Sequence, residues 1–75
     1  MVETDMDANL RKWIDGKVDT AESLMAEGEH GARAAALMVE GIDATIAEVE
    51  RLEQRDLNLG ETGDRFHLLR KLLGR

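Results

Sequence analysis

The chain has 75 residues, of which 43% are apolar and 35% are charged, and it contains no cysteine and no proline. At this length it forms at most one domain, residues 1–75, and without cysteine it has neither a disulfide framework nor a cysteine zinc site. No apolar run is long enough to cross a bilayer, and the first residues are acidic, unlike a signal peptide, so we expect a cytoplasmic protein without membrane association.

Charge is unevenly distributed along the chain. Sixteen acidic and ten basic residues give a net charge of −6, and direct binding of nucleic acid is therefore not expected. Residues 57–75 carry two acidic and four basic residues, whereas residues 1–56 carry fourteen and six. A basic segment after an acidic body is expected to dock on that body or to meet an acidic partner.

Apolar residues at steps of three and four predict a first helix over residues 4–27. The stripe consists of Leu10, Ile14, Val18, Ala21 and Met25. Met6, Trp13 and Leu24 lie on its flank and widen the apolar arc to about 140°, because each residue turns the helix by about 100°.

Local signals at the ends and in the middle of this helix are less uniform. Thr4 and Asp7 have the spacing of a capping box, and Gly28 predicts the end of the helix because glycine accepts the left-handed conformation. Gly16 allows two interpretations. Either it ends a shorter helix that restarts at Asp19, or the helix is continuous and Gly16, like Gly41, marks a close approach to a partner backbone or to a third helix.

A second stripe predicts a helix over residues 31–56. Its members recur at steps of four and three: Ala35, Val39, Ile42, Ile46 and Val49. Because the connection after Gly28 is short, the two long helices are expected to be antiparallel neighbours.

A short third helix is predicted over residues 63–73, with Thr62 or Asp64 as its cap. Such a short helix is marginal alone in water, so it needs apolar cover. We expect its apolar side to pack across the hairpin, within the chain or on a sister chain, while its basic residues stay in solvent. The apolar residues are Phe66, Leu69 and Leu73, and the basic residues are Arg70 and Lys71. The predicted class is therefore all-α: an antiparallel hairpin with a third helix, a small bundle completed by oligomerisation.

Motifs that carry chemistry are weak. Glu27 and His30 have the Glu-x-x-His spacing of di-iron bundles, but Gly28 interrupts the helix and no second copy of the motif exists. Neither histidine has the surroundings of a catalytic triad, and the glycine-containing turns lack the lysine of a phosphate loop. We expect no enzymatic activity, no cofactor and no metal.

These features favour a small non-enzymatic protein–protein interaction module (an adaptor, a chaperone-like protein or an inhibitor) that acts through apolar helix faces. The apolar stripes are wider than a contact between two helices uses, which favours a homo-oligomer, with a dimer as the expected form. The interface candidates are Met6, Leu10, Trp13, Leu24, Phe66, Leu69 and Leu73.

The alternative hypothesis is a nucleic-acid-related regulator. It is either an acidic DNA mimic that blocks a DNA-binding protein, or a regulator that uses its basic C-terminal helix, with Arg65, Arg70 and Lys71 as the basic-face candidates. Loss of partner binding in high salt would favour the mimic, whereas binding that is insensitive to salt would favour apolar contacts.

Overall fold

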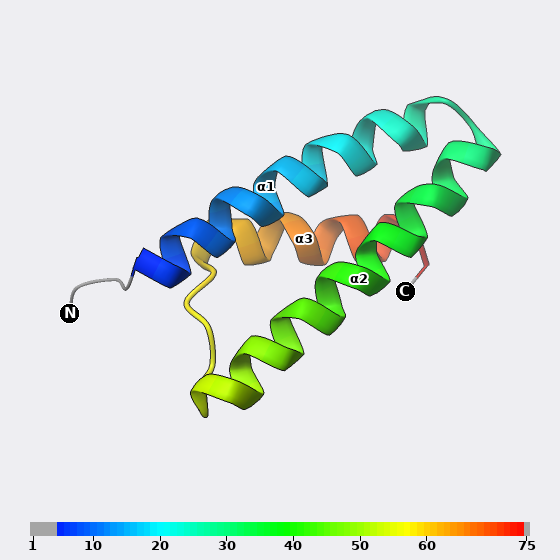
Figure 1. Ribbon diagram of the computed structural model, residues 1–75. Helices are drawn as coiled ribbons and strands as arrows, with labels where there is room; N and C mark the ends of the chain where they lie inside the picture. The colour runs from blue at the N-terminus through cyan, green and yellow to red at the C-terminus, as the bar shows by residue number, and fades with distance from the viewer. Residues whose placement is uncertain (1–4, 75) are drawn as a thin grey trace.

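The computed structural model describes residues 5–74, and these residues form three helices and no strand. Helix α1 spans Asp5–Ala26, α2 spans Glu29–Glu53 and α3 spans Gly60–Leu72. Helices α1 and α2 form an antiparallel hairpin, and α3 crosses it (Figure 1). The predicted all-α hairpin with a third helix is confirmed.

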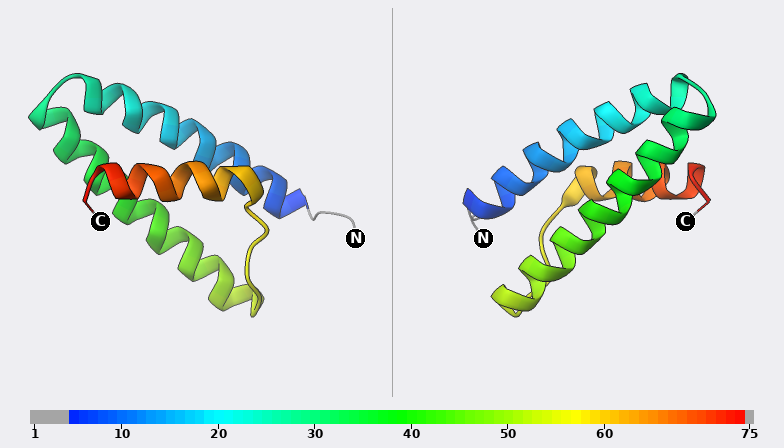
Figure 2. Two further views of the ribbon diagram at one scale, coloured as in Figure 1. Left: turned by 180° about the vertical axis from the view of Figure 1, so that it is seen from behind. Right: turned by 45° about the vertical axis from the view of Figure 1, so that its right-hand side comes forward.

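The core lies where the three helices meet. Views from different sides place α3 on one face of the hairpin, so that no helix formed by the described residues covers the opposite face (Figure 2). Phe66 and Leu69 are buried, and Leu73 packs at the edge of the core, as predicted for docking within the chain. The buried apolar residues are Ile14, Val18, Ala21, Ala35, Val39, Ile42, Phe66 and Leu69.

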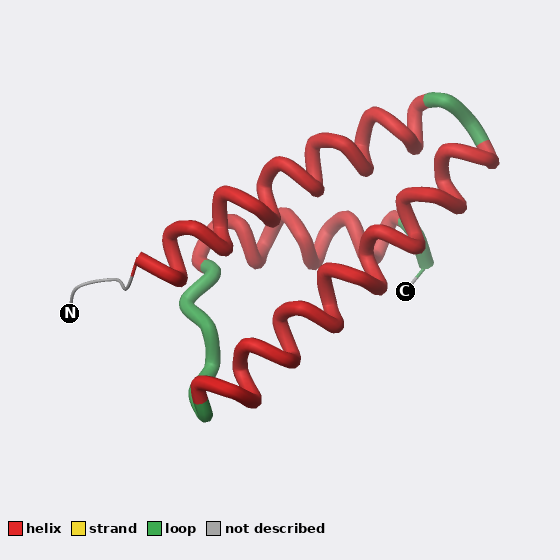
Figure 3. Tube along the Cα trace, in the orientation of Figure 1, coloured by secondary structure: helices red, strands yellow, loops and turns green. Residues whose placement is uncertain are grey.

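The helix ends lie within three residues of the predicted positions, and Figure 3 shows the two connections between them. Helix α2 ends three residues early because Gln54 is left-handed, with φ 55°, and donates its N–H to the Glu50 carbonyl. Helix α3 begins three residues early, and the predicted caps are wrong, because no side chain caps it and Thr62 and Asp64 lie inside the helix. The predicted cap at Thr4 lies outside the described residues.

Gly16 does not interrupt α1, which is continuous over 22 residues, so the shorter-helix interpretation is wrong. A Cβ atom at Gly16 or Gly41 would meet nothing within 4 Å, so neither glycine marks a close approach to α3. Hydroxyl groups accompany both glycines: Thr20 donates to the Gly16 carbonyl at 3.0 Å, and Thr45 donates to the Gly41 carbonyl at 2.9 Å.

The turn between α1 and α2 requires glycine at two positions. Gly28 has φ 108°, a conformation that residues with a Cβ rarely adopt. A Cβ atom on Gly31 would lie 1.7 Å from the Leu24 carbonyl oxygen. The first turn of α2 therefore packs directly on the backbone of the last turn of α1.

None of the described helices combines the length and the apolar composition that a membrane span requires.

Candidate functional site

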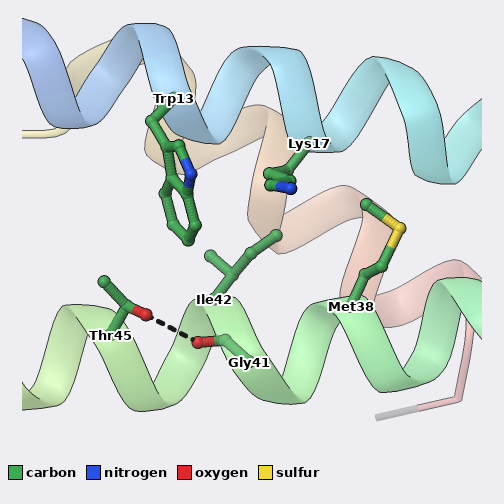
Figure 4. A pocket seen from close by; sticks show the side chains of 6 residues that line it. All are labelled: Trp13, Lys17, Met38, Gly41, Ile42 and Thr45. Carbon is green, nitrogen blue, oxygen red and sulfur yellow. Dashed lines mark hydrogen bonds between the residues drawn. The ribbon is translucent and has the colours of Figure 1, made fainter.

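A groove runs between α1 and α2 on the hairpin face that lies away from α3, which we call the open face. Figure 4 shows Trp13 from α1 and Ile42 from α2 pointing into the space between the two helices, with α3 behind them. The groove has a volume of about 260 Å³ and is lined by Trp13, Lys17, Met38, Gly41, Ile42 and Thr45.

Helical spacing explains why the groove lies at the edge of the core. Ile14 points between the helices and is 0% exposed, whereas its neighbour Trp13 lies on the flank of the stripe and is 40% exposed. Gly41 keeps the groove open, because it lines the groove and has no side chain to fill it. Sequence reasoning identified Trp13 and named Gly41 as a possible close approach to a partner backbone, but it missed Lys17, Met38 and Thr45 as groove residues. The spacing of 38, 41 and 45 on one flank of α2 was the available signal.

The groove differs in charge from the chain as a whole. Among the described residues that line it, Lys17 is the one charged side chain, although the net charge of the chain is −6. The Lys17 ammonium lies 5.8 Å from the centroid of the Trp13 ring, within the range of a cation–π contact. The groove therefore combines an apolar surface with a single positive charge.

Acidic residues of α1 contact α3 on the other side of the hairpin. Arg65 donates hydrogen bonds to three carboxylates that follow one face of α1: Asp15 at 3.4 Å, Asp19 at 2.7 Å and Glu22 at 2.9 Å. The Thr62 hydroxyl also donates to Asp15, at 3.2 Å. The hydrogen bond to Asp19 raises the pKa of Arg65 above its ordinary value.

Arg70 is half-buried, which corrects the prediction that it stays in solvent. Its Nε lies 3.6 Å from the Asp43 carboxylate of α2, and its guanidinium lies 5.9 Å from the centroid of the Phe66 ring. Because α3 crosses the hairpin at this point, its C-terminal half brings Arg70 over α2. Lys71 is exposed, as predicted.

A second polar contact joins the first turns of α1 to the connection between α2 and α3. Asp7 is 3% exposed and accepts two hydrogen bonds from Arg55, at 2.6 and 3.1 Å. The Asn58 N–H also donates to Asp7, and Arg11 donates to the Asn58 carbonyl at 2.7 Å. The hydrogen bond to Asp7 raises the pKa of Arg55. Sequence reasoning missed this pair, because its members are 48 residues apart and Asp7 was assigned to a helix cap.

The structure separates the predicted interface residues into two groups. Met6 and Trp13 are exposed, and Leu10 and Leu24 are half-buried, all on α1. The candidates on α3 pack in or against the core of the same chain. Large apolar residues that are exposed on α2 and α3 are Leu37, Leu52, Leu68 and Leu72.

Within residues 5–74, no group of three or more histidine, aspartate or glutamate residues is arranged to hold a metal ion, and His30 and His67 are both exposed.

In comparisons with known proteins, no family model, no curated protein and no solved structure matched the chain.

Proposed function

We propose that this chain is a small, non-enzymatic protein–protein interaction module of the cytoplasm that binds its partner through the open face of the α1–α2 hairpin. The observation that supports this function is the groove, which places a half-exposed tryptophan beside adaptable Met38 and a bare backbone at Gly41. Tryptophan in a concave, apolar patch is typical of the residues that dominate the affinity of protein interfaces. An adaptor, a chaperone-like protein or an inhibitor would each use such a surface.

The size of the groove favours a protein partner over a small molecule. Its volume of about 260 Å³ lies just below the range of roughly 300–1,000 Å³ that small-molecule pockets occupy. One or two large side chains of a partner would fill it, and Met38 can adjust to their shape because its side chain is flexible and polarisable.

The nucleic-acid-related alternative has less support. Arg65 contacts three carboxylates of α1, and Arg70 lies beside Asp43 of α2. Both arginines therefore serve the contact between α3 and its own hairpin, where their charge is compensated.

Capture of proteins from an extract of the native host, identified by mass spectrometry, tests the proposed function. We expect a specific protein to bind the unmodified chain and a Leu72→Asp control, but not Trp13→Ala or Met38→Asp. Binding should persist in about 0.5 M salt, because apolar contacts are not screened. A partner that is unaffected by the groove variants, or that is lost in this salt, would contradict the proposal.

A further inference from the structure

We infer that a second copy of this chain covers the open face, with the two hairpins related by a twofold axis. In this arrangement four long helices form a bundle, and each α3 lies on its outside. The inference rests on the proposed function, since it names a partner for the same surface.

The first supporting observation is the amount of exposed surface. The large apolar side chains exposed on the hairpin are Met6 and Trp13 of α1 and Leu37 and Leu52 of α2. The extents of the chain are 41 × 19 × 16 Å. A face with the two larger extents offers roughly 800 Å², which is the area that each partner buries in a stable interface of standard size.

The second observation is the distribution of charge. Two chains of net charge −6 repel each other least where the surfaces that meet carry few carboxylates. The groove is such a surface, because no carboxylate lines it. The three carboxylates of α1 that contact Arg65 lie on the opposite side of the hairpin. The open face is therefore where two copies can approach with the least repulsion.

The third observation concerns the geometry of α2. Gly41 has no side chain, and nothing lies within 4 Å of the position of a Cβ, so two α2 backbones can approach closely there. With the twofold axis midway between Gly41 and Thr45, antiparallel α2 helices place Gly41 of one copy opposite Thr45 of the other, and the Met38 level opposite the Glu48 level. Such a contact is self-complementary, so every pair of residues occurs twice.

This geometry produces a specific charge pair. Lys17 lines the groove together with Met38. Glu48 is exposed one turn after Thr45 on α2, where its carboxylate accepts hydrogen bonds from Arg51 of the same helix. Lys17 of each copy therefore faces Glu48 of the other copy, which gives two ion pairs in the dimer. Charge complementarity of this kind selects the partner and the register of the contact.

Sedimentation equilibrium of the full chain tests the inference, over about 1 to 300 µM so that weak and moderate dimers are both detected. We expect the unmodified chain to form a species of twice 8.4 kDa. Lys17→Glu and Glu48→Lys should each raise the dissociation constant about tenfold, because each replaces two ion pairs by two like-charge contacts. An equimolar mixture of the two variants should recover the original affinity, since both pairs are again complementary in the mixed dimer. Glu61→Lys, an exposed site on α3, should leave the affinity unchanged.

A chain that remains monomeric at the highest concentration would overturn the inference, as would a dimer that neither charge variant affects or a mixture that does not recover. The proposed function is judged separately: if a monomeric chain still captures another protein through Trp13 and Met38, the function stands and the second copy is excluded.

Discussion

Gly31 and Gly16 both lie inside helices, but their surroundings are opposite. At Gly31 a Cβ would collide with the Leu24 carbonyl, which belongs to the backbone and cannot rotate away. At Gly16 a Cβ would meet nothing within 4 Å. Glycine costs about 1 kcal/mol relative to alanine in a helix interior, where Gly16 lies, whereas Gly31 is the third residue of α2. Packing requires glycine only at Gly31.

We therefore expect Gly31→Ala to destabilise the protein by about 3 kcal/mol, at the upper end for overpacked sites, because the backbones of α1 and α2 must separate. Gly16→Ala should stabilise it by about 1 kcal/mol through helix propensity alone. Urea denaturation of the two variants measures both changes. Equal changes in the free energy of unfolding for the two variants would contradict the tight contact at Gly31.

Asp7 is a buried carboxylate that holds the connection between α2 and α3 through Arg55 and the Asn58 N–H. We expect Asp7→Asn to lower the Tm by about 5–10 °C, because an amide has one acceptor oxygen and therefore loses one of the two guanidinium hydrogen bonds, together with the charge that strengthens them. Thermal denaturation followed by circular dichroism gives the shift. The control is Asp64→Asn at an exposed site on α3, which should leave the Tm nearly unchanged. A similar Tm for both variants would contradict the buried pair.

At the scale of the elements, apolar burial and charge have different roles in the docking of α3. Phe66 and Leu69 are buried, and each contributes about 1.5–3 kcal/mol when fully removed from water. The ion pairs of Arg65 are 40% exposed on the arginine side, and exposed pairs contribute at most about 1 kcal/mol each. Burial therefore supplies most of the docking energy, and Arg65 sets the position of α3 along α1.

Reversing the charge at position 65 tests whether the ion pairs of Arg65 position α3 along α1. Arg65→Glu places a fourth carboxylate among Asp15, Asp19 and Glu22, so we expect the backbone amides of α3 to lose protection from hydrogen exchange and the Tm to fall by about 5 °C. High salt should reduce the difference from the unmodified chain, because it screens the repulsion. Lys71→Glu makes the same charge change at an exposed position of α3 and should leave the protection intact. Unchanged protection in Arg65→Glu would mean that Asp15, Asp19 and Glu22 do not position α3.

At the scale of the whole molecule, the inferred dimer has a thermodynamic consequence. A partner that binds only the folded state stabilises it by mass action, so the Tm of a dimer depends on protein concentration. We expect the Tm to rise by about 3–6 °C for each tenfold increase in concentration, and by less in Lys17→Glu. Melting curves at about 10 and 100 µM suffice to detect such a shift. A Tm that is independent of concentration would indicate a monomer.

Much of this fold follows from the sequence alone, because the signals involved are local. Apolar residues spaced three and four apart define the faces of α1, α2 and α3, and Gly28 marks the turn. The burial of Phe66 and Leu69 also follows, since a short amphipathic helix requires apolar cover. These inferences need only the periodicity of a helix and the preference of apolar surface for burial, both of which act over a few residues.

The tertiary structure decides the features that join distant residues. The pair of Asp7 with Arg55 and the contact of Arg70 with Asp43 depend on where α3 crosses the hairpin, which no local pattern encodes. The groove likewise exists because α3 covers one face of the hairpin and leaves Trp13 and Gly41 on the other. A helix stripe specifies which residues prefer burial, but which side of the hairpin receives the third helix depends on the summed packing and charge of all three elements.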